Sequence, residues 1–314
     1  MRNYILPMQT NFDIRKFWGA AAMVTATLLW GGSFSSQSYG MRTVPPLTFL
    51  MLRSVVAALA LIPVAALFDR FRTGRVTLWG AAKTTAERKL LFSGGVWCGV
   101  ALGFASGFQQ YGIKYTSAGK AGFLTALYIV IVPLLGIFFK RRATLGQWAA
   151  TALALTGSYL LCGGLTRVGF GEVMLIVGAI LFSGHILVID RYAAQCDCVR
   201  LSCIQFAVTS LITCAGSLAV GDPWVAADIL GALPFWMYCG IFAGAAAFTL
   251  QMVAQKYLHP VAATLLMSLE SVFAAIGGRF FLDERLTATE LTGCAVIFVA
   301  VILSQLPPVR LPRR

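Results

Sequence analysis

Charged side chains are scarce in this sequence. They make up 12% of the 314 residues, whereas 58% are hydrophobic and the mean hydropathy is +0.79. Roughly a quarter of the residues in a soluble globular protein are charged, so this chain has too few charges to cover a surface that faces water. The shortage excludes a soluble domain of this size and predicts a membrane protein.

Groups of residues that form catalytic or metal sites are also missing. The sequence has two histidines and contains no HExxH motif, no GxSxG motif and no paired aspartates of a membrane protease. The eight cysteines are scattered, and Cys196 and Cys198 have no histidine near them in the sequence to complete a zinc site with four ligands. We therefore expect no metal, no cofactor and no enzymatic activity, with the thiols reduced or buried.

Apolar segments of about 20 residues, the length of a membrane-spanning helix, recur along the whole chain. The first 16 residues contain no apolar core of a signal peptide, so we expect a short tail that leads into the first span. Ten spans are predicted, at 17–37, 46–68, 90–111, 117–139, 144–163, 170–190, 199–220, 232–254, 260–282 and 288–306.

The net charge of +13 reflects an uneven distribution of the 25 Lys and Arg residues. If the N-terminus is cytoplasmic, most of them lie in cytoplasmic segments, including 69–89, 140–142 and 310–314. Membrane proteins carry this excess on their cytoplasmic side. The charge therefore predicts a multi-pass protein of the inner (plasma) membrane with both termini cytoplasmic. Lipid is the expected partner, nucleic acid is not, and a homodimer is left open.

The sequence repeats itself at an offset of 142 residues. Residues 108–139 and 250–281 are identical at ten of 32 positions, among them Gln109 and Gln251. Each repeat holds five predicted spans, and because five is odd the second copy must enter the membrane inverted.

A weaker match at an offset of 152 aligns 28–34 with 179–186 and sets Arg53 opposite Gln205. We predict an all-α membrane protein with ten transmembrane helices arranged as two inverted five-helix repeats, 17–163 and 170–306. Inverted repeats are characteristic of transporters, whose substrate site lies between the halves.

A stripe of small residues runs along the third predicted span. Its glycines recur every fourth residue, which lets helix backbones approach closely in lipid. We interpret the stripe as a packing surface rather than a substrate site. It comprises Gly95, Gly99, Gly103 and Gly107, and the eighth span keeps Gly240 and Gly244.

One carboxyl group stands in the middle of an apolar span. Glu270 lies about halfway along 260–282, too deep for its short side chain to reach water. A charge at the bilayer centre costs roughly 2.5–3.5 kcal/mol, and an apolar environment favours the neutral form of a carboxyl. We interpret Glu270 as a group that exchanges a proton or meets a substrate amine. A static hydrogen bond or ion pair between helices is the alternative.

Other polar side chains within the spans are candidates for a substrate cavity. Lys120 either binds an acidic substrate group or extends to the lipid headgroups, and Arg53 either binds substrate or reaches water. His185 fits a packing residue better than a proton relay. Trp30, Tyr128 and Phe123 are the expected apolar wall, and the remaining polar candidates are Ser33, Gln109, Gln110 and Gln251.

Taken together, these motifs resemble the EamA branch of the drug/metabolite transporter superfamily. The resemblance rests on "LLWGGSF" (28–34), "QQYGIKYTSAGKAGFLTALYIVIVPLLG" (109–136), and "LMSLESVFAAIGG" with the following "LDERLTATELTGC" (266–294). Where the family commonly has proline after the glutamate, this chain has Ser271, which predicts a straighter helix beside Glu270. The resemblance implies alternating access, with a central cavity lined mainly by spans 1, 3, 4, 6, 8 and 9.

The sequence thus predicts a secondary transporter that exports small organic metabolites, such as amino acids or related compounds. Proton coupling through Glu270 is the mechanistic hypothesis, with Lys120 and the glutamines binding the acidic or polar end of the solute. An uncoupled exchanger or facilitator of another metabolite class is one alternative. A membrane protein that does not transport, either an enzyme or a scaffold, is the other.

Overall fold

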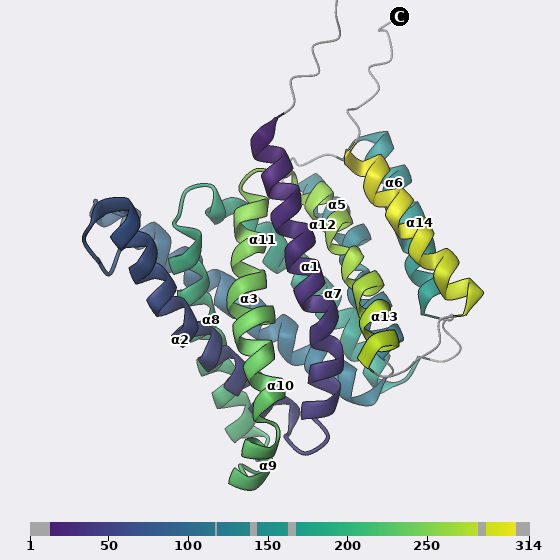
Figure 1. The fold of residues 1–314 in the computed structure, drawn as a ribbon, viewed down its shortest axis with the longest axis horizontal. Helices are drawn as coiled ribbons and strands as arrows, with labels where there is room; N and C mark the ends of the chain where they lie inside the picture. Colours follow the sequence, from purple (N-terminus) through teal and green to yellow (C-terminus); the bar gives the residue numbers. More distant parts are fainter. Residues whose placement is uncertain (1–12, 117, 139–142, 163–167, 282–286, 306–314) are drawn as a thin grey trace, which may run out of the picture.

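The computed structural model describes residues 13–116, 118–138, 143–162, 168–281 and 287–305. These residues form helices and connecting turns, with no strand among them (Figure 1). The helices are α1 (Ile14–Gly40), α2 (Pro46–Thr73), α3 (Thr85–Tyr115), α4 (Ala118–Thr125), α5 (Tyr128–Phe138), α6 (Leu145–Leu161), α7 (Phe170–Ala193), α8 (Cys198–Ala219), α9 (Ala226–Gly231), α10 (Leu233–Tyr238), the π-helix η1 (Cys239–Ala246), α11 (Ala247–Gln255), α12 (Pro260–Met267), α13 (Leu269–Phe281) and α14 (Ala288–Gln305).

Each predicted span contains helix, although three of them are built from more than one element. Within the described ranges, seven helices are long and apolar enough to cross a membrane, and 288–304 forms a shorter apolar helix. The total of ten crossings stays a prediction. The predicted limits at 117, 139, 163, 282 and 306 lie outside the described residues.

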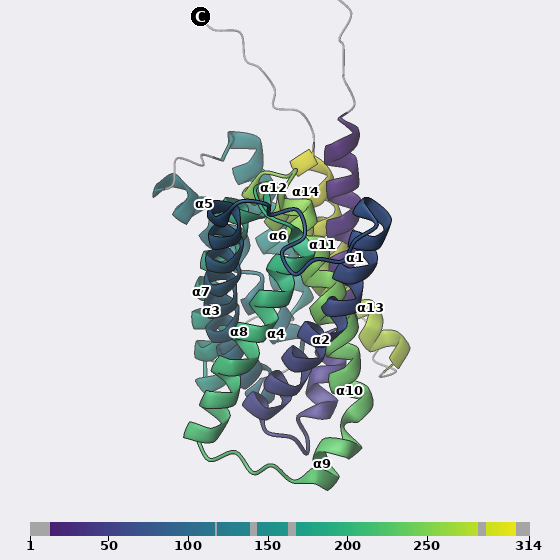
Figure 2. The same ribbon diagram turned by 90° about the vertical axis from the view of Figure 1, so that its left-hand side faces the viewer.

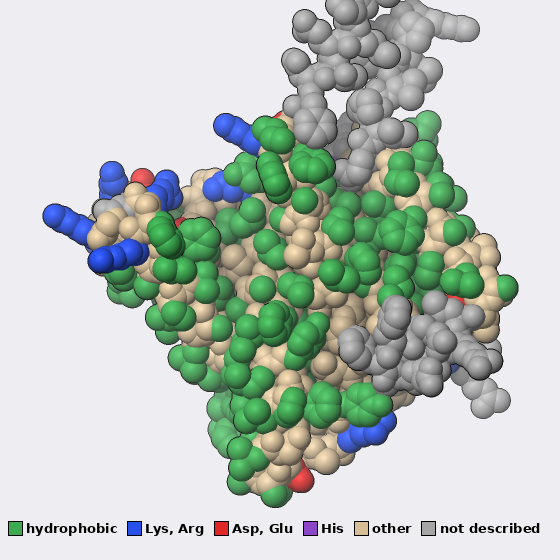
Figure 3. Space-filling model, viewed as in Figure 1, with side chains coloured by type: hydrophobic (Ala, Val, Ile, Leu, Met, Phe, Trp, Pro, Cys, Tyr) green, Lys and Arg blue, Asp and Glu red, His purple; other side chains and the backbone are tan. Residues whose placement is uncertain are grey.

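The two ends of the helix bundle differ in which segments they carry. The Ile14 end carries the first residues of α1 and α3 and the last residues of α2 and α7. The Met41 end carries the last residues of α1, the first residues of α2, and α9 (Figures 1 and 2). The described end of α14 also lies at the Ile14 end (Figure 1). Hydrophobic side chains cover much of the face between the two ends (Figure 3), as expected for a surface that faces lipid.

The helices of each half pack extensively against helices of the other half. The second helices pair with each other, α2 with α8, and so do the last ones, α6 with α14. The first helix of each half packs mainly on the other half: α1 contacts η1, α11 and α13, and α7 contacts α3, α4 and α5. This arrangement is a two-repeat architecture with the third and fourth spans of each half next to the first helix of the other.

The predicted glycine stripe is a packing surface. A Cβ atom added at Gly95 or Gly99 would lie 2.6 Å from side-chain atoms of Ile204 and Val208, respectively, on α8. The equivalent contact in the other half sets Gly240 of η1 against Val56 of α2, at 2.7 Å. The packing interpretation is therefore confirmed for these glycines. Because they have no side chain, side chains of the neighbouring helix can pack directly against their backbone.

The fourth span of each half is interrupted near its middle. The first break falls after α4, at Ala126 and Leu127, and the second falls between α12 and α13, at Ser268. The offset of 142 maps Ala126 onto Ser268, so both repeats break at the same place. This second interruption comes three residues before Ser271, and the straighter helix expected from Ser271 stays a prediction.

Candidate functional site

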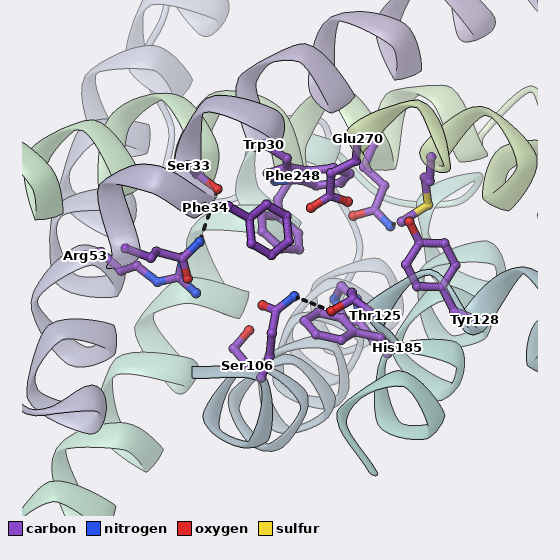
Figure 4. A pocket seen from close by; sticks show the side chains of 15 residues that line it. Trp30, Ser33, Phe34, Arg53, Ser106, Thr125, Tyr128, His185, Phe248 and Glu270 are labelled. Carbon is purple, nitrogen blue, oxygen red and sulfur yellow. Dashed lines mark hydrogen bonds between the residues drawn. The ribbon is translucent and has the colours of Figure 1, made fainter. Parts of the chain in front are cut away.

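A cavity lies at the centre of the bundle, between the two halves (Figure 4). It is narrow: the space open to the centres of water molecules is about 40 Å³, enough for roughly three waters. Eight of the ten predicted site residues line it. The lining residues are Trp30, Ser33, Phe34, Gln37, Arg53, Ser106, Gln109, Thr125, Tyr128, Phe182, His185, Phe248, Gln251, Met267 and Glu270.

Most of the lining consists of equivalent positions from the two halves. The offset of 152 relates lining residues on α1 to lining residues on α7, and the offset of 142 relates those on α3, α4 and α5 to those on α11, α12 and α13. On α1, α3, α7 and α11 the paired positions lie three residues apart and share one helix face. The equivalent pairs are Trp30 and Phe182, Ser33 and His185, Ser106 and Phe248, Gln109 and Gln251, Thr125 and Met267, and Tyr128 and Glu270.

Glu270 and its counterpart Tyr128 each stand at the start of a helix inside the bundle. Tyr128 is the first residue of α5, and Glu270 is the second residue of α13. Both residues line the cavity, and the Tyr128 side chain interacts with the Glu270 carboxyl. The main-chain N–H groups at these breaks stay paired: Ile129 and Val130 donate to the carbonyl oxygens of Ala126 and Leu127, and Ser271 donates to that of Ser268. Discontinuous helices of this kind form the binding sites of many transporters.

Arg53 brings a positive charge to the cavity from α2. Its side chain is half-buried, contacts the Cys239 thiol of η1 and lies across the cavity from Tyr128 (Figure 4). Among the described residues, neither Arg53 nor Glu270 forms an ion pair within 4.0 Å. The cavity therefore holds one basic and one acidic side chain, and each is available to a bound solute.

Amide side chains add hydrogen-bonding groups between these two charges. Gln109 donates to the Thr125 hydroxyl at 3.3 Å, and its counterpart Gln251 points its amide nitrogen at the sulfur of Met267 at 3.9 Å. Gln37 donates to the Ser33 hydroxyl at 3.2 Å. The side-chain carbonyl oxygens of Gln37 and Gln251 are buried without a hydrogen-bond partner. Such acceptors are rare in folded proteins and are free to bind a solute N–H.

Trp30 fixes the first helix against the second half. Its indole N–H donates to the main-chain oxygen of Ala243, in η1, at 2.9 Å. Its ring meets the Phe248 ring edge to face, with centroids 5.0 Å apart. Short π-helical stretches within helices frequently occur at functional sites, and this one supplies a carbonyl to a cavity residue. Trp30 thus lines the cavity and also links α1 to η1 through a hydrogen bond.

His185 is buried at the base of the cavity and paired with an amide. Its Nε2 atom lies 2.8 Å from Oε1 of Gln205 on α8, and its Nδ1 atom has no hydrogen-bond partner. Phe182 and Phe248 each pack against its ring. The structure therefore shows His185 as a packed residue that also lines the cavity; the proton relay stays an untested alternative.

Two predicted site residues do not line this cavity. The Lys120 ammonium lies 4.0 Å from Oε1 of Glu172, near the start of α7, and its side chain is a quarter exposed. Gln110 is fully buried and donates to the sulfur of Met41 at 3.0 Å. Phe123, expected in the wall, is also absent from the lining and packs against Tyr159.

The sequence analysis did not select seven of the lining residues. Several of them stand three residues before a selected one on the same helix, so a helical period applied to the candidates finds them. The offset of 152 also finds Phe182 from Trp30. The seven residues are Phe34, Gln37, Ser106, Thr125, Phe182, Phe248 and Met267.

These features define a class of protein. The chain is an integral membrane protein with a small polar cavity at the interface of two structural repeats, where transporters bind their solutes. It belongs to the EamA-like transporter family, whose profile matches residues 17–163 and again residues 169–306. The family thus covers both halves of the chain.

Two curated relatives match the chain over nearly its whole length. An uncharacterized transporter of Archaeoglobus fulgidus is 24% identical over 316 residues, which cover 98% of this chain and 94% of the relative. The uncharacterized transporter YwfM of Bacillus subtilis is 21% identical over 296 residues, 91% of this chain and 93% of YwfM. A solved crystal structure superposes with a TM-score of 0.73 at 15% identity, over 91% of this chain and 96% of the other. That likeness concerns the fold alone.

Proposed function

We propose that this protein transports small zwitterionic organic solutes, amino acids or close relatives, by alternating access. The observation that carries the proposal is the pair of charges in the cavity, Arg53 on one side and Glu270 on the other, with no ion pair between them. A guanidinium binds a carboxylate through two parallel hydrogen bonds, and a carboxylate binds an ammonium group. A solute that carries both charges complements the cavity.

Arg53 takes the role for which Lys120 was the sequence candidate. Lys120 stands beside Glu172 and outside the cavity lining, whereas Arg53 lines the cavity itself. The uncharged part of the solute meets the aromatic wall of Trp30 and Phe248. Because the space holds only about three waters, a solute the size of an amino acid requires the halves to move apart on one side.

Glu270 is the proposed coupling group. It is half-buried in the bundle, and the described residues offer it the Tyr128 hydroxyl rather than a cation. A carboxyl in this setting can bind a proton on one side of the membrane and release it on the other. Coupling to the proton gradient would drive export from the cytoplasm across the inner membrane.

The proposed orientation has the Ile14 end in the cytoplasm. Both described chain ends lie there, as does the turn between α2 and α3 with Arg75 and Lys83 (Figure 1). Positive charge concentrates on the cytoplasmic side of membrane proteins. A protease that cleaves this turn only in inverted membrane vesicles would agree with the orientation, and cleavage in intact cells would contradict it.

The experiment is uptake and counterflow in proteoliposomes with a panel of labelled amino acids and other metabolites. Each solute is tested with and without an imposed pH gradient, for the wild-type chain and for Glu270→Gln. Glu87→Gln is the matched control, because Glu87 caps α3 in a capping box and glutamine can fill the same role.

We expect amino-acid movement that responds to the gradient in the wild type and the control but not in Glu270→Gln. If Glu270→Gln transports like the wild type at every pH, coupling through this carboxyl is wrong and an uncoupled exchanger or facilitator remains. If the wild type moves other metabolites and no amino acid, the substrate class is wrong. A chain that moves no solute of the panel would favour an enzyme or a scaffold.

A further inference from the structure

The cavity lining departs from the repeat symmetry at three positions. Phe34, Gln37 and Arg53 line the cavity, and all three lie on the Met41 side of Trp30 and Ser33 or on the part of α2 nearest that end. The offset of 152 gives their counterparts in the second half, none of which lines the cavity. These counterparts are Ile186, Ile189 and Gln205, and each is 0% exposed.

The region around these counterparts is polar although it is closed. Gln205 approaches His185 on α7 from α8, and Gln255 donates to the main-chain oxygen of Ile186 from α11, at 3.0 Å. The amide nitrogen of Gln205 and the side-chain oxygen of Gln255 are buried without partners. An unpaired buried polar group costs free energy, and here two such groups flank the same turn of α7.

In the first half the equivalent positions line the cavity. There, Gln37 on α1 and Arg53 on α2 form part of its wall, and their counterparts are Ile189 on α7 and Gln205 on α8. In transporters built from inverted repeats, one half rocks against the other around a fixed site. If the halves exchange conformations, the second-half positions become the open ones.

We propose that Ile189, Gln205 and Gln255 line a second access pathway, which opens from the central cavity to the Ile14 end when the Met41 side closes. The proposal rests on the alternating access of the proposed function. Opening hydrates the two unpaired amides, so the cost they carry in the closed arrangement is removed. Gln205 then faces the solute from the second half, as Arg53 does from the first.

The two pathways differ in charge. A solute carboxylate meets a guanidinium on the Met41 side and a neutral amide on the Ile14 side. The two open states therefore bind the acidic end of the solute with different strengths.

The test is cysteine labelling from each face of the membrane with a maleimide that does not cross it. Four single variants are compared in intact cells and in inverted vesicles: Ile189→Cys, Gln255→Cys, Gln37→Cys and Lys83→Cys. The exposed Lys83 position, in the turn before α3, marks the face of the Ile14 end. Peptide mass spectrometry scores each added cysteine separately, so the native cysteines stay in place and the fully buried Cys98 serves as the slow reference.

We expect Ile189→Cys and Gln255→Cys to react from the same face as Lys83→Cys, more than about tenfold faster than Cys98, since even a minor open state exposes them. Gln37→Cys should react from the opposite face. The pathway is refuted if both variants react no faster than Cys98 from either face, or react from the Gln37 face. None of these outcomes depends on the solute. Labelling as expected without amino-acid transport would overturn the proposed substrate class and leave the pathway standing.

Discussion

Arg53→Gln should selectively weaken the transport of solutes that carry a carboxylate. The side chain is half-buried in a cavity about 40 Å³ in extent and forms no ion pair with a described residue. Among the described residues, its side chain interacts with the Cys239 thiol, a weak hydrogen-bonding group. A bound carboxylate would therefore be the strongest partner that the guanidinium meets.

The size of the effect follows from that contact. A hydrogen bond to a charged group contributes about 1.5–3 kcal/mol, and about 1.4 kcal/mol corresponds to a tenfold change in affinity. Arg53→Gln should raise the half-saturating concentration of an amino acid roughly 10- to 140-fold. Arg53→Lys keeps the charge but loses the planar fork, so its effect should be smaller.

The assay compares each amino acid with the amine that lacks its carboxylate. Half-saturating concentrations are measured in proteoliposomes for the wild type and Arg53→Gln, with Cys239→Ala as the control that removes the thiol contact. The amine should be affected much less than the amino acid. An equal loss for the amine and the amino acid would refute the reasoning, because it would mean that Arg53 supports the fold and not the solute.

Three further predictions concern stability and are measured by thermal unfolding in detergent. Trp30→Phe keeps the ring but removes the indole donor to η1, and should cost about 1 kcal/mol; an unchanged midpoint would show that the bond is replaced by water. In Gly99→Leu even the added Cβ lies 2.6 Å from atoms of α8, so the variant should lose at least about 1–3 kcal/mol of stability. The control Gly184→Leu, where a Cβ has nothing within 4 Å, should lose less. Asp69→Ala removes the carboxylate 2.6 Å from the buried Arg200 guanidinium but leaves its ion pair with Asp197 at 3.1 Å, and should cost about 1.5–3 kcal/mol; a loss similar to that of an exposed pair would contradict the buried role.

The span pattern and the repeat could be predicted from the sequence because both depend on local composition. Apolar length defines a membrane helix, and an offset of 142 survives in identities such as Gln109 and Gln251. The same reasoning selected Glu270 from its isolation among apolar neighbours. The position of a residue within an apolar span gives its approximate depth in the membrane. A charged residue near the middle of a span can therefore be recognised from the sequence alone.

Side-chain direction was not accessible in the same way. Lys120 and Arg53 look alike in sequence, since each is a cation in the outer part of a span. The structure separates them because Lys120 stands next to Glu172 on α7, while Arg53 faces the cavity. That difference depends on which helices are neighbours across the two halves, and helix rotation is set by packing rather than by hydropathy.

The repeat relation also explains why the cavity is chemically uneven although its frame is symmetrical. The two halves place equivalent residues around one centre, but Tyr128 stands where the second half has Glu270, and Gln205 stands where the first half has Arg53. One half thus supplies the acid and the other the base. A homodimer of identical five-helix units would duplicate both groups or neither. Because the two halves are parts of one chain, each can differ from the other, and a single cavity holds two opposite charges.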